Sequence, residues 1–490
     1  MEMMRLALYQ ERNVLFDHTT THRLARMLKF IIAIGLLLPN LSFPMFSGTI
    51  EKALPISVIQ EKIASARPGD TIVIFGGTYL GNLVIDKRVS LLGLNSPVVC
   101  GEGVGSVVTF AADSCTLKGF TIEHSGTMLV NEDAGVLVKS NGNVIEENQL
   151  RDVLFGVYLL TADGNSIVRN TIVGRKRLEL GERGSGMHLF NSHHNKFKGN
   201  IIRDVRDGFY IQYANHTLIE ENQASGLRYG VHYMYADSNV FLRNKFFDNV
   251  AGAAIMYSRG ILIRSNEFVH NRGFSSFGIL FQDCHGLVAD SNLIADNVVG
   301  MFYESSTNNL FRHNIIARND VALEMFQNSA GNTFSENNFI ENLSPLILIG
   351  KHTGTRWSLN GAGNYWSSYG GYDLDHDGIG DVPMKIQNVF SYLEGVRPNL
   401  RLYLNSPASQ ALSMATEAFP IVAINEEVDD HPLVRPVPLL SIVAAGSTNS
   451  PAPMVAGSEE AKGGALYVPM LLILIAVGIS YFHLARREAI

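Results

Sequence analysis

The chain of 490 residues carries few charges: Lys, Arg, Asp and Glu make up 17% of it, whereas 46% of its residues are hydrophobic. This composition excludes a disordered chain and a charge-rich coiled coil. A net charge of −7 offers no basic field to phosphate backbones, so nucleic acid is excluded as a partner. The three cysteines, Cys100, Cys115 and Cys284, lack the spacing of a thiolate metal site. Cys100 and Cys115 could pair in an oxidising compartment, but buried free thiols are commoner.

Residues 1–48 have the order of a secretory signal. A basic stretch at residues 22–29 precedes an apolar run at residues 30–38, which Pro39 ends. A positive segment before a short apolar segment is typical of export signals, and the run is shorter than a membrane span requires. We therefore expect residues 1–48 to direct the protein out of the cytoplasm. Because no A-x-A pattern marks a cleavage site, an uncleaved anchor remains open.

An amphipathic helix is expected over residues 56–66, followed by a repetitive region. An Asn followed two places later by an apolar residue recurs at spacings of 22, 30, 22, 22, 22, 26, 22 and 23. A unit of about 22 residues, rich in β-branched, aromatic and turn residues, predicts one coil of a parallel β-helix. We expect this all-β solenoid over residues 50–350, with the helix covering its first coil and Trp357 and Trp366 closing the other end. The recurrent residues are Asn148, Asn170, Asn200, Asn222, Asn244, Asn266, Asn292, Asn314 and Asn337.

The recurrent Asn side chains are expected to form a structural hydrogen-bonded ladder in the turns. A Gly opens the next apolar segment of most coils, and both long spacings insert residues between the Asn and this Gly. The third residue after the Gly should face the interior, and the second and fourth should face outward. The outward strip is rich in Tyr, Phe, His and Met, as binding surfaces are. Its expected partner-contacting residues are Tyr158, His188, Tyr210, Phe302, Glu304 and Glu324.

Two kinds of chemistry are open to this strip. Met234 and Met256 occupy one column on successive coils about 4.8 Å apart, and His232 lies two residues before Met234. Two thioethers and an imidazole suit copper(I), although the same side chains could instead contact a protein partner. Glu304 and Glu324 lie on adjacent coils at a separation that could approach the roughly 6.5–9.5 Å of paired carboxylates in sugar hydrolysis. No further cluster of charged residues supports a role in sugar hydrolysis. The alternative is that Glu304 and Glu324 are two solvated surface glutamates.

An acidic loop follows the last coil. Asp373, Asp375 and Asp377 alternate, a glycine comes next, and Asp381 follows. This order matches the first, third, fifth and sixth positions of a calcium loop, but Met384 stands where a bidentate Glu closes such loops. A weak calcium site and an acidic turn without metal are both open.

The stretch from Trp366–Tyr369 to Asp377–Asp381, after coils that open at Pro68–Val73 and Gly77–Tyr79, resembles the NosD family. The resemblance runs from about residue 55 to 436. It implies a right-handed β-helix and a periplasmic accessory protein that is not an enzyme. It also implies partnership with the ATPase and permease of an ABC transporter, and maturation of the copper–sulfur centre of nitrous oxide reductase with copper delivered by a lipoprotein chaperone. The alternative is a glycan-binding or glycan-cleaving β-helix protein of the cell envelope.

The C-terminal part is expected to cap and anchor the β-helix. Residues 351–400 form the expected cap with the acidic loop, and residues 401–434 a partner-contacting tail. Residues 435–464, rich in Pro, Ala, Gly and Ser, suit a flexible linker. Residues 465–484 contain no charged residue, and two arginines follow them. This pattern predicts a transmembrane helix that anchors the protein in the cytoplasmic membrane with its body outside.

Overall fold

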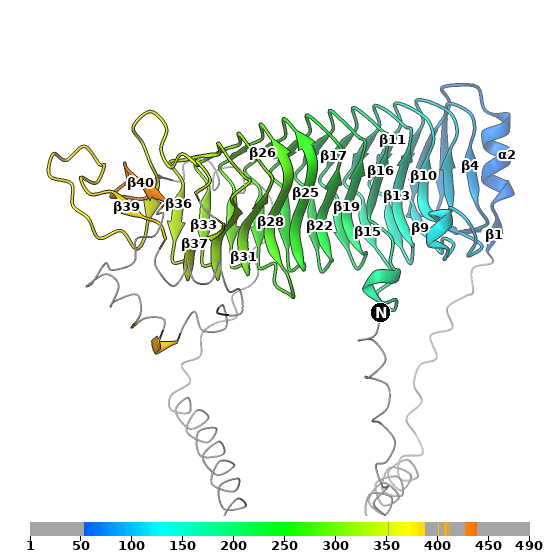
Figure 1. Cartoon of the computed structure of the whole chain (residues 1–490). Helices are drawn as coiled ribbons and strands as arrows, with labels where there is room; N and C mark the ends of the chain where they lie inside the picture. The colour runs from blue at the N-terminus through cyan, green and yellow to red at the C-terminus, as the bar shows by residue number, and fades with distance from the viewer. Residues whose placement is uncertain are drawn as a thin grey trace, which may run out of the picture. The chain divides into compact units, whose positions relative to one another are not determined.

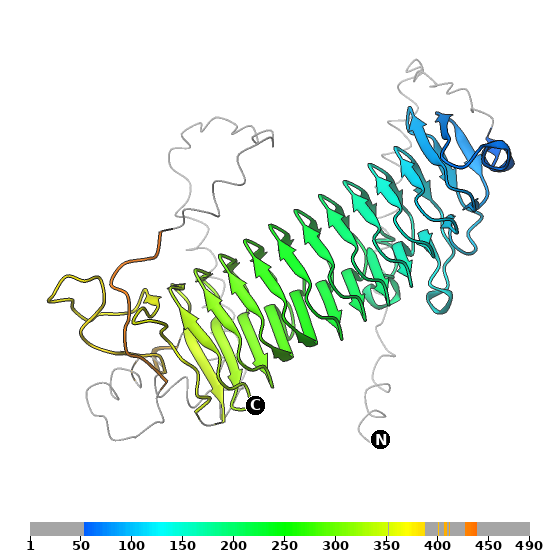
Figure 2. The same cartoon turned by 90° about the horizontal axis from the view of Figure 1, so that it is seen from above.

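The computed structural model describes residues 53–350, 352–387, 400, 406–408, 411 and 427–438. The chain winds into a right-handed parallel β-solenoid of about 13 turns with about 22 residues per coil. Helix α2 (Ser57–Ser65) lies against the first coils and buries Ile59 and Ile63 (Figures 1 and 2). The predicted β-helix and its covering helix are therefore confirmed.

Most coils contribute one strand to each of three parallel sheets. We call the first of these the strip sheet, because the outward strip lies on it. Its strands, in order, are β4 (Leu83–Ile85), β7 (Val108–Phe110), β10 (Ala134–Val138), β13 (Phe155–Leu160), β16 (Met187–Phe190), β19 (Asp207–Gln212), β22 (Tyr229–Met234), β25 (Ala251–Arg259), β28 (Phe277–His285), β31 (Val299–Glu304), β34 (Val321–Phe326) and β37 (Ser344–Ile349).

The other two sheets complete the coils. The second sheet comprises β2 (Thr71–Phe75), β5 (Ser90–Leu94), β8 (Thr116–Lys118), β11 (Val144–Glu146), β14 (Ser166–Val168), β17 (Lys196–Lys198), β20 (Leu218–Glu220), β23 (Val240–Leu242), β26 (Leu262–Arg264), β29 (Val288–Asp290), β32 (Leu310–Arg312) and β35 (Thr333–Ser335). The third comprises β1 (Leu54–Pro55), β3 (Thr78–Leu80), β6 (Val98–Cys100), β9 (Thr121–Glu123), β12 (Gln149–Arg151), β15 (Thr171–Val173), β18 (Ile201–Arg203), β21 (Gln223–Ser225), β24 (Lys245–Phe247), β27 (Glu267–Val269), β30 (Leu293–Ala295), β33 (Ile315–Ala317), β36 (Asn338–Ile340) and β38 (Tyr365–Trp366).

The interior of the solenoid is apolar, as the strand pattern predicts. The third residue after each strand-opening Gly or Ala is at most 1% exposed, and aromatic pairs such as Phe281 and Tyr303 stack between coils with centroids 5.3 Å apart. Both insertions enter the strip sheet at the same corner, between β15 and β16 and between β27 and β28. The interior residues of this column are Leu159, Leu189, Ile211, Tyr233, Ile255, Phe281, Tyr303 and Met325.

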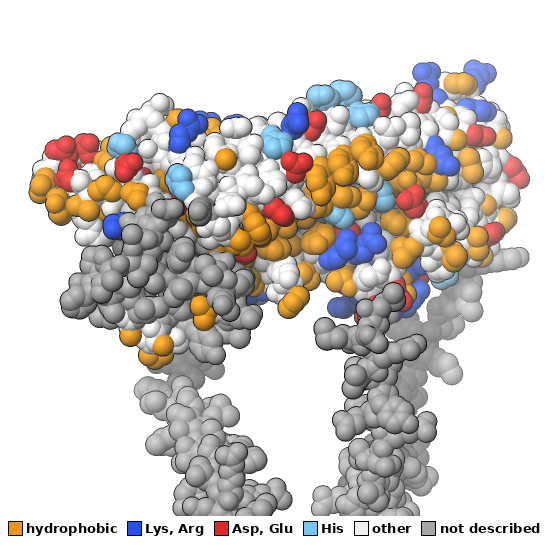
Figure 3. Space-filling view, viewed as in Figure 1, with side chains coloured by type: hydrophobic (Ala, Val, Ile, Leu, Met, Phe, Trp, Pro, Cys, Tyr) orange, Lys and Arg blue, Asp and Glu red, His pale blue; other side chains and the backbone are white. Residues whose placement is uncertain are grey.

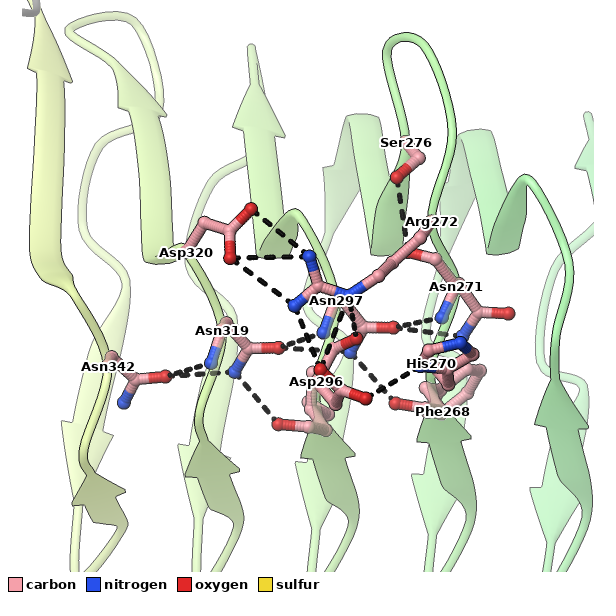
Figure 4. A network of polar contacts seen from close by, with 11 residues as sticks. Phe268, His270, Asn271, Arg272, Ser276, Asp296, Asn297, Asn319, Asp320 and Asn342 are labelled. Carbon is pink, nitrogen blue, oxygen red and sulfur yellow. Dashed lines mark hydrogen bonds and ion pairs between the residues drawn. The ribbon is translucent and has the colours of Figure 1, made fainter. Parts of the chain in front are cut away.

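The predicted asparagine ladder is present and continues to Asn364 at the end of the solenoid. Oδ1 of Asn148 accepts the backbone N–H of Phe120, and each later Oδ1 accepts that of the Asn one coil earlier, as from Asn222 to Asn244 at 2.9 Å. The sequence pattern did not reveal a second ladder of this kind, at another corner of the coils. Figure 4 shows part of it, with surface Arg272 bound to Asp296 and Asp320 beside it. That ladder consists of Asn249, Asn271, Asn297, Asn319 and Asn342.

The far end of the solenoid is closed by aromatic rings and by a returning segment. Trp357 and Trp366, both buried, stack on the phenyl rings of the last coils, in agreement with the prediction. Strands β39 (Met384–Lys385) and β40 (Val428–Asp429) pair antiparallel. The buried carboxylates of Glu427 and Asp429 accept the indole N–H groups of Trp357 and Trp366 at 2.8 and 3.0 Å. Residues 427–434, expected in a partner-contacting tail, therefore belong to the cap.

The remaining expectations concern the ends and the cysteines. Within the part of the chain that the structure describes, no helix is long and apolar enough to cross a membrane. The expected signal (1–48), the expected transmembrane helix (465–484) and residues 439–464 of the expected linker all lie outside the described residues. The three cysteines are free thiols, so Cys100 and Cys115 are not bonded to each other.

Candidate functional site

The outward strip begins as a column of stacked rings on β13, β16, β19 and β22. Tyr158, His188, Tyr210 and His232 are register neighbours in that order. The ring centroids of successive members are 4.5, 4.6 and 4.9 Å apart. Figure 3 shows this face of the solenoid, where hydrophobic side chains form a band with charged and histidine side chains among them. The predicted column thus exists, with its side chains pointing away from the interior.

The first two rings of this column are not accessible to a partner. Tyr158 is 4% exposed and His188 is 7% exposed. Leu178, from the insertion that contains η2 (Leu180–Glu182), packs against the apolar cluster around Tyr158. Burial, together with a hydrogen bond to Glu132 just after η1 (Leu129–Asn131), raises the pKa of Tyr158. The prediction that Tyr158 and His188 form an open surface is therefore wrong, because segments outside the coil fold over them.

His188 is buried as a neutral imidazole. Burial lowers its pKa to about 4, and the nearby positive charge of Arg206 acts in the same direction. Its Nδ1 is buried and makes no hydrogen bond to any described residue. The ring is held by its aromatic neighbours rather than by polar partners, so it contributes shape and packing beneath the insertion.

A buried carboxylate lies beside the column, and sequence reasoning missed it. Asp207 is fully buried at the start of β19, with Arg206 at 3.1 Å, Arg228 at 2.7 Å and Nδ1 of His232 at 3.6 Å. Burial alone would raise the pKa of Asp207, but hydrogen bonds from His232 and Arg228 outweigh it, so the pKa lies below its ordinary value. The carboxylate is therefore charged, binds Arg228 and lies beside His232. The sequence contains one hint of this buried carboxylate: Asp207 is acidic, whereas its register partner on the next coil is Tyr229.

The strip then becomes accessible and rich in donor atoms. Met234 on β22 and Met256 on β25 are direct register partners, and both are half-buried. His232 lies two residues before Met234 on the same strand face, and its side chain is 15% exposed. Nδ1 of His232 lies 3.6 Å from the carboxylate of Asp207 and 3.4 Å from the guanidinium of Arg228. In the tautomer that carries hydrogen on Nδ1, toward Asp207, Nε2 has a lone pair for a ligand. Thioether and imidazole donors therefore lie on neighbouring strands of one face.

Carboxylates follow further along the strip. Glu304 on β31 accepts a hydrogen bond from Nε2 of Gln282 at 3.1 Å. Glu324 on β34 is the register partner of Phe302, so the two carboxylates stand in different columns of adjacent strands. Phe302 is half-buried and packs on Phe277 with centroids 5.0 Å apart. Tyr210, Phe302, Glu304 and Glu324 all remain partly accessible, unlike the first two rings of the strip.

Comparison with known proteins places the chain in a family. A family model described as "Periplasmic copper-binding protein (NosD)" matches residues 164–371. The "Probable ABC transporter binding protein NosD" of Pseudomonas aeruginosa is 33% identical over 375 residues, covering 73% of this chain and 87% of the relative. The protein of the same name from Stutzerimonas stutzeri is 31% identical, covering 73% and 85%.

The chain belongs to the NosD family. Solved structures give a likeness of fold. The A-module of mannuronan C-5 epimerase AlgE4 from Azotobacter vinelandii has a TM-score of 0.48 at 15% identity, with 62% of this chain and 94% of the module covered. An alginate lyase from Paenibacillus sp. str. FPU-7 has a TM-score of 0.41 at 17% identity, with 49% and 93% covered. At these identities the likeness says nothing of the chemistry of this NosD protein.

The acidic loop of this NosD protein lies in the cap, away from the strip. Oxygens of Asp373, Asp375 and Asp377 all lie within 4.8 Å of one another. Asp381 does not join them, because its carboxylate accepts the backbone N–H of Leu374 at 2.7 Å. Three of the four expected calcium ligands are thus brought together, and calcium binding stays a prediction. A cleft of about 640 Å³ lies beside the loop, lined by Trp366, Tyr369, Tyr372, Pro383, Met384 and Lys385 among others.

Proposed function

We propose that this NosD protein is an extracytoplasmic, non-enzymatic accessory protein in the maturation of nitrous oxide reductase. It receives copper from a lipoprotein chaperone and holds it on the strip sheet, and it docks with the ATPase and permease of an ABC transporter at the membrane. Family membership supports this proposal, since the family is described as periplasmic and copper-binding and the relatives are named as ABC transporter binding proteins. Copper, or a sulfur species moved by the transporter, is cargo in this scheme.

The proposed copper ligands follow from one observation: Met234 and Met256 are register partners on adjacent strands. Strands about 4.8 Å apart bring two thioethers of one column within reach of a single ion. Soft thioethers together with an imidazole select copper(I) over harder cations. His232 supplies that imidazole from the same face of β22, with the carboxylate of Asp207 3.6 Å from its Nδ1. The donor set therefore fits a copper(I) cargo.

Replacing Met234 and Met256 together by alanine is expected to weaken copper(I) binding by about 100-fold, because the two donors act as one chelate. An anaerobic titration against a copper(I) chelator measures this change. Met128, an exposed methionine outside the strip, provides the matched control, and Met128→Ala should bind as the wild type does. Unchanged copper(I) affinity in the double variant would remove these residues from the proposal.

A maturation assay tests the wider role. Cells that lack this protein should produce nitrous oxide reductase without an intact copper–sulfur centre, and full maturation in such cells would refute the proposal. Glycan chemistry on Glu304 and Glu324 is the competing function. Turnover of an envelope oligosaccharide by the purified chain that is lost in Glu304→Gln would replace the accessory role with an enzymatic one.

A further inference from the structure

Two histidines stack on the corner of the solenoid that follows the strip sheet. His194 comes after β16 and His216 comes after β19, at equivalent places on adjacent coils. Their ring centroids are 5.0 Å apart and the ring planes differ by 11°. Both side chains are exposed, and neither ring makes a hydrogen bond or an ion pair to another described residue. The ring nitrogens of this pair are therefore available to a ligand.

The backbone conformation of this turn does not require histidine at these positions. His194 and His216 have φ of 55° and 56°, in the left-handed region. Glycine is the residue best suited to such a conformation. From β8 onward, most other coils have glycine at the equivalent place, and the remaining ones have a small polar residue. Those residues, all with positive φ, are Ser114, Gly142, Gly164, Ser238, Gly260, Gly286, Asn308, Gly331 and Gly354.

A third histidine nearby, His193, has a structural role in the same turn. Nδ1 of His193 accepts the backbone N–H of Asn215 at 3.1 Å. On the coils before and after, a side-chain oxygen takes that role: Asp163 accepts the N–H of His193, and Asn215 accepts that of Asp237. A neutral ring that accepts at Nδ1 carries its hydrogen on Nε2 and has no lone pair left for a metal. The candidate ligands are therefore His194 and His216.

We propose that His194 and His216 form a two-imidazole site for copper(II). Neutral imidazole binds copper, nickel and zinc, and for a given nitrogen site copper(II) binds most tightly among the first-row divalent metals. Metal–nitrogen bonds of about 2.0–2.1 Å require the two nitrogens to lie within about 4 Å of each other. Rotation of two exposed side chains from a stack at 5.0 Å supplies that approach. Two protein ligands leave coordination positions open to a donor from another protein.

The site uses other residues and another oxidation state than Met234 and Met256, so it goes beyond the proposed function and does not depend on it. The test is a copper(II) titration of the full chain, purified without a polyhistidine tag and followed by electron paramagnetic resonance. One bound copper(II) with hyperfine coupling to two imidazole nitrogens is expected. His194→Gly or His216→Gly alone should weaken binding by about 100-fold through loss of the chelate, and the double variant should lose the two-nitrogen signal.

Glycine is the matched replacement, because other coils carry it at this turn with the same sign of φ. A gain-of-site variant strengthens the test. Adding Gly142→His and Gly164→His to the double variant should restore the two-nitrogen signal. Glycines at these positions lie on adjacent coils with φ of 66° and 65°, and a Cβ there would meet no heavy atom closer than 3.6 Å.

Two controls separate this proposal from the methionine site. His270→Ala removes an exposed histidine elsewhere on the surface and should leave copper(II) binding unchanged. Met234→Ala with Met256→Ala should retain the two-nitrogen copper(II) signal whatever happens to copper(I). Wild-type copper(II) affinity and spectrum in the double glycine variant would overturn the two-histidine site. Loss of the signal in the methionine variant would overturn it as well, since the ligands would then lie on the strip.

Discussion

Asn244→Ala is expected to lower the free energy of unfolding by roughly 3–9 kcal/mol, because two buried backbone groups and one amide hydrogen lose their partner at about 1–3 kcal/mol each. Oδ1 of Asn244 accepts both the backbone N–H and the side-chain amide of Asn222, at 2.9 and 3.0 Å. Its Nδ2 donates to the carbonyl of Ile219 at 2.7 Å. Alanine leaves these groups inside a fully buried turn without the amide that pairs with them.

Urea unfolding followed by far-ultraviolet circular dichroism measures this loss. Lys245→Ala is the matched control, since this neighbouring side chain is 49% exposed and pairs with Glu267 at 3.0 Å. An exposed ion pair contributes about 0–1 kcal/mol, so the control should stay close to wild type. Coils of a solenoid contact only their neighbours, and the variant can therefore also unfold in two steps around the altered coil. A loss below 1 kcal/mol in one cooperative step would show that the ladder does not hold the coils together.

Acidification from pH 6.5 to pH 4 is expected to cost the folded state about 3 kcal/mol through His188 alone, from a pKa shift of about 2.5. Above pH 6.5 this ring is neutral both folded and unfolded, so it adds no pH dependence. Below pH 6.5 the imidazole is protonated in the unfolded chain but stays neutral in the folded protein. The free energy of unfolding therefore falls. The loss levels off near pH 4, where the folded ring is protonated too.

His188→Phe should remove this pH dependence, because a phenyl ring fills the same place between Tyr158 and Tyr210 without titrating. Reversible urea unfolding at several pH values from 7 to 4 measures the slope. His270→Gln, at an exposed histidine, is the control for substitution of an imidazole as such. Asp207 acts in a different window: its pKa is lowered from 3.8, so the stability it provides is lost only as the pH falls below that value. Equal slopes in wild type and His188→Phe would contradict the neutral buried state.

The coil architecture was predictable because one repeat obeys one set of local rules. Each coil needs an apolar strand residue every second position and an amide at the same turn, and both leave a visible spacing in the sequence. The same logic located the two insertions at one corner of the coil. The second ladder escaped notice because it covers only the later coils: the equivalent place on the earlier coils is occupied by Val153, Arg175, Val205 and Leu227.

The candidate site was predictable only in part. Alternation along a strand shows which side chains point outward, and it placed Tyr210, His232, Met234 and Met256 correctly on one face. It does not show what lies over that face, and so it missed the burial of Tyr158 and His188. The direction in which an insertion folds depends on contacts far apart in the sequence. One example is Arg175, whose guanidinium donates to the carbonyls of Ser125 and Gly126.

The pairing of β39 with β40 has a consequence for the chain between them. The backbone N–H of Ile386 donates to the carbonyl of Glu427 at 3.0 Å, so two residues far apart in the sequence lie side by side in the cap. Both strands of this pair lie in the cap beyond the last coil, so a change in the number of residues between them would leave the register of every coil unchanged.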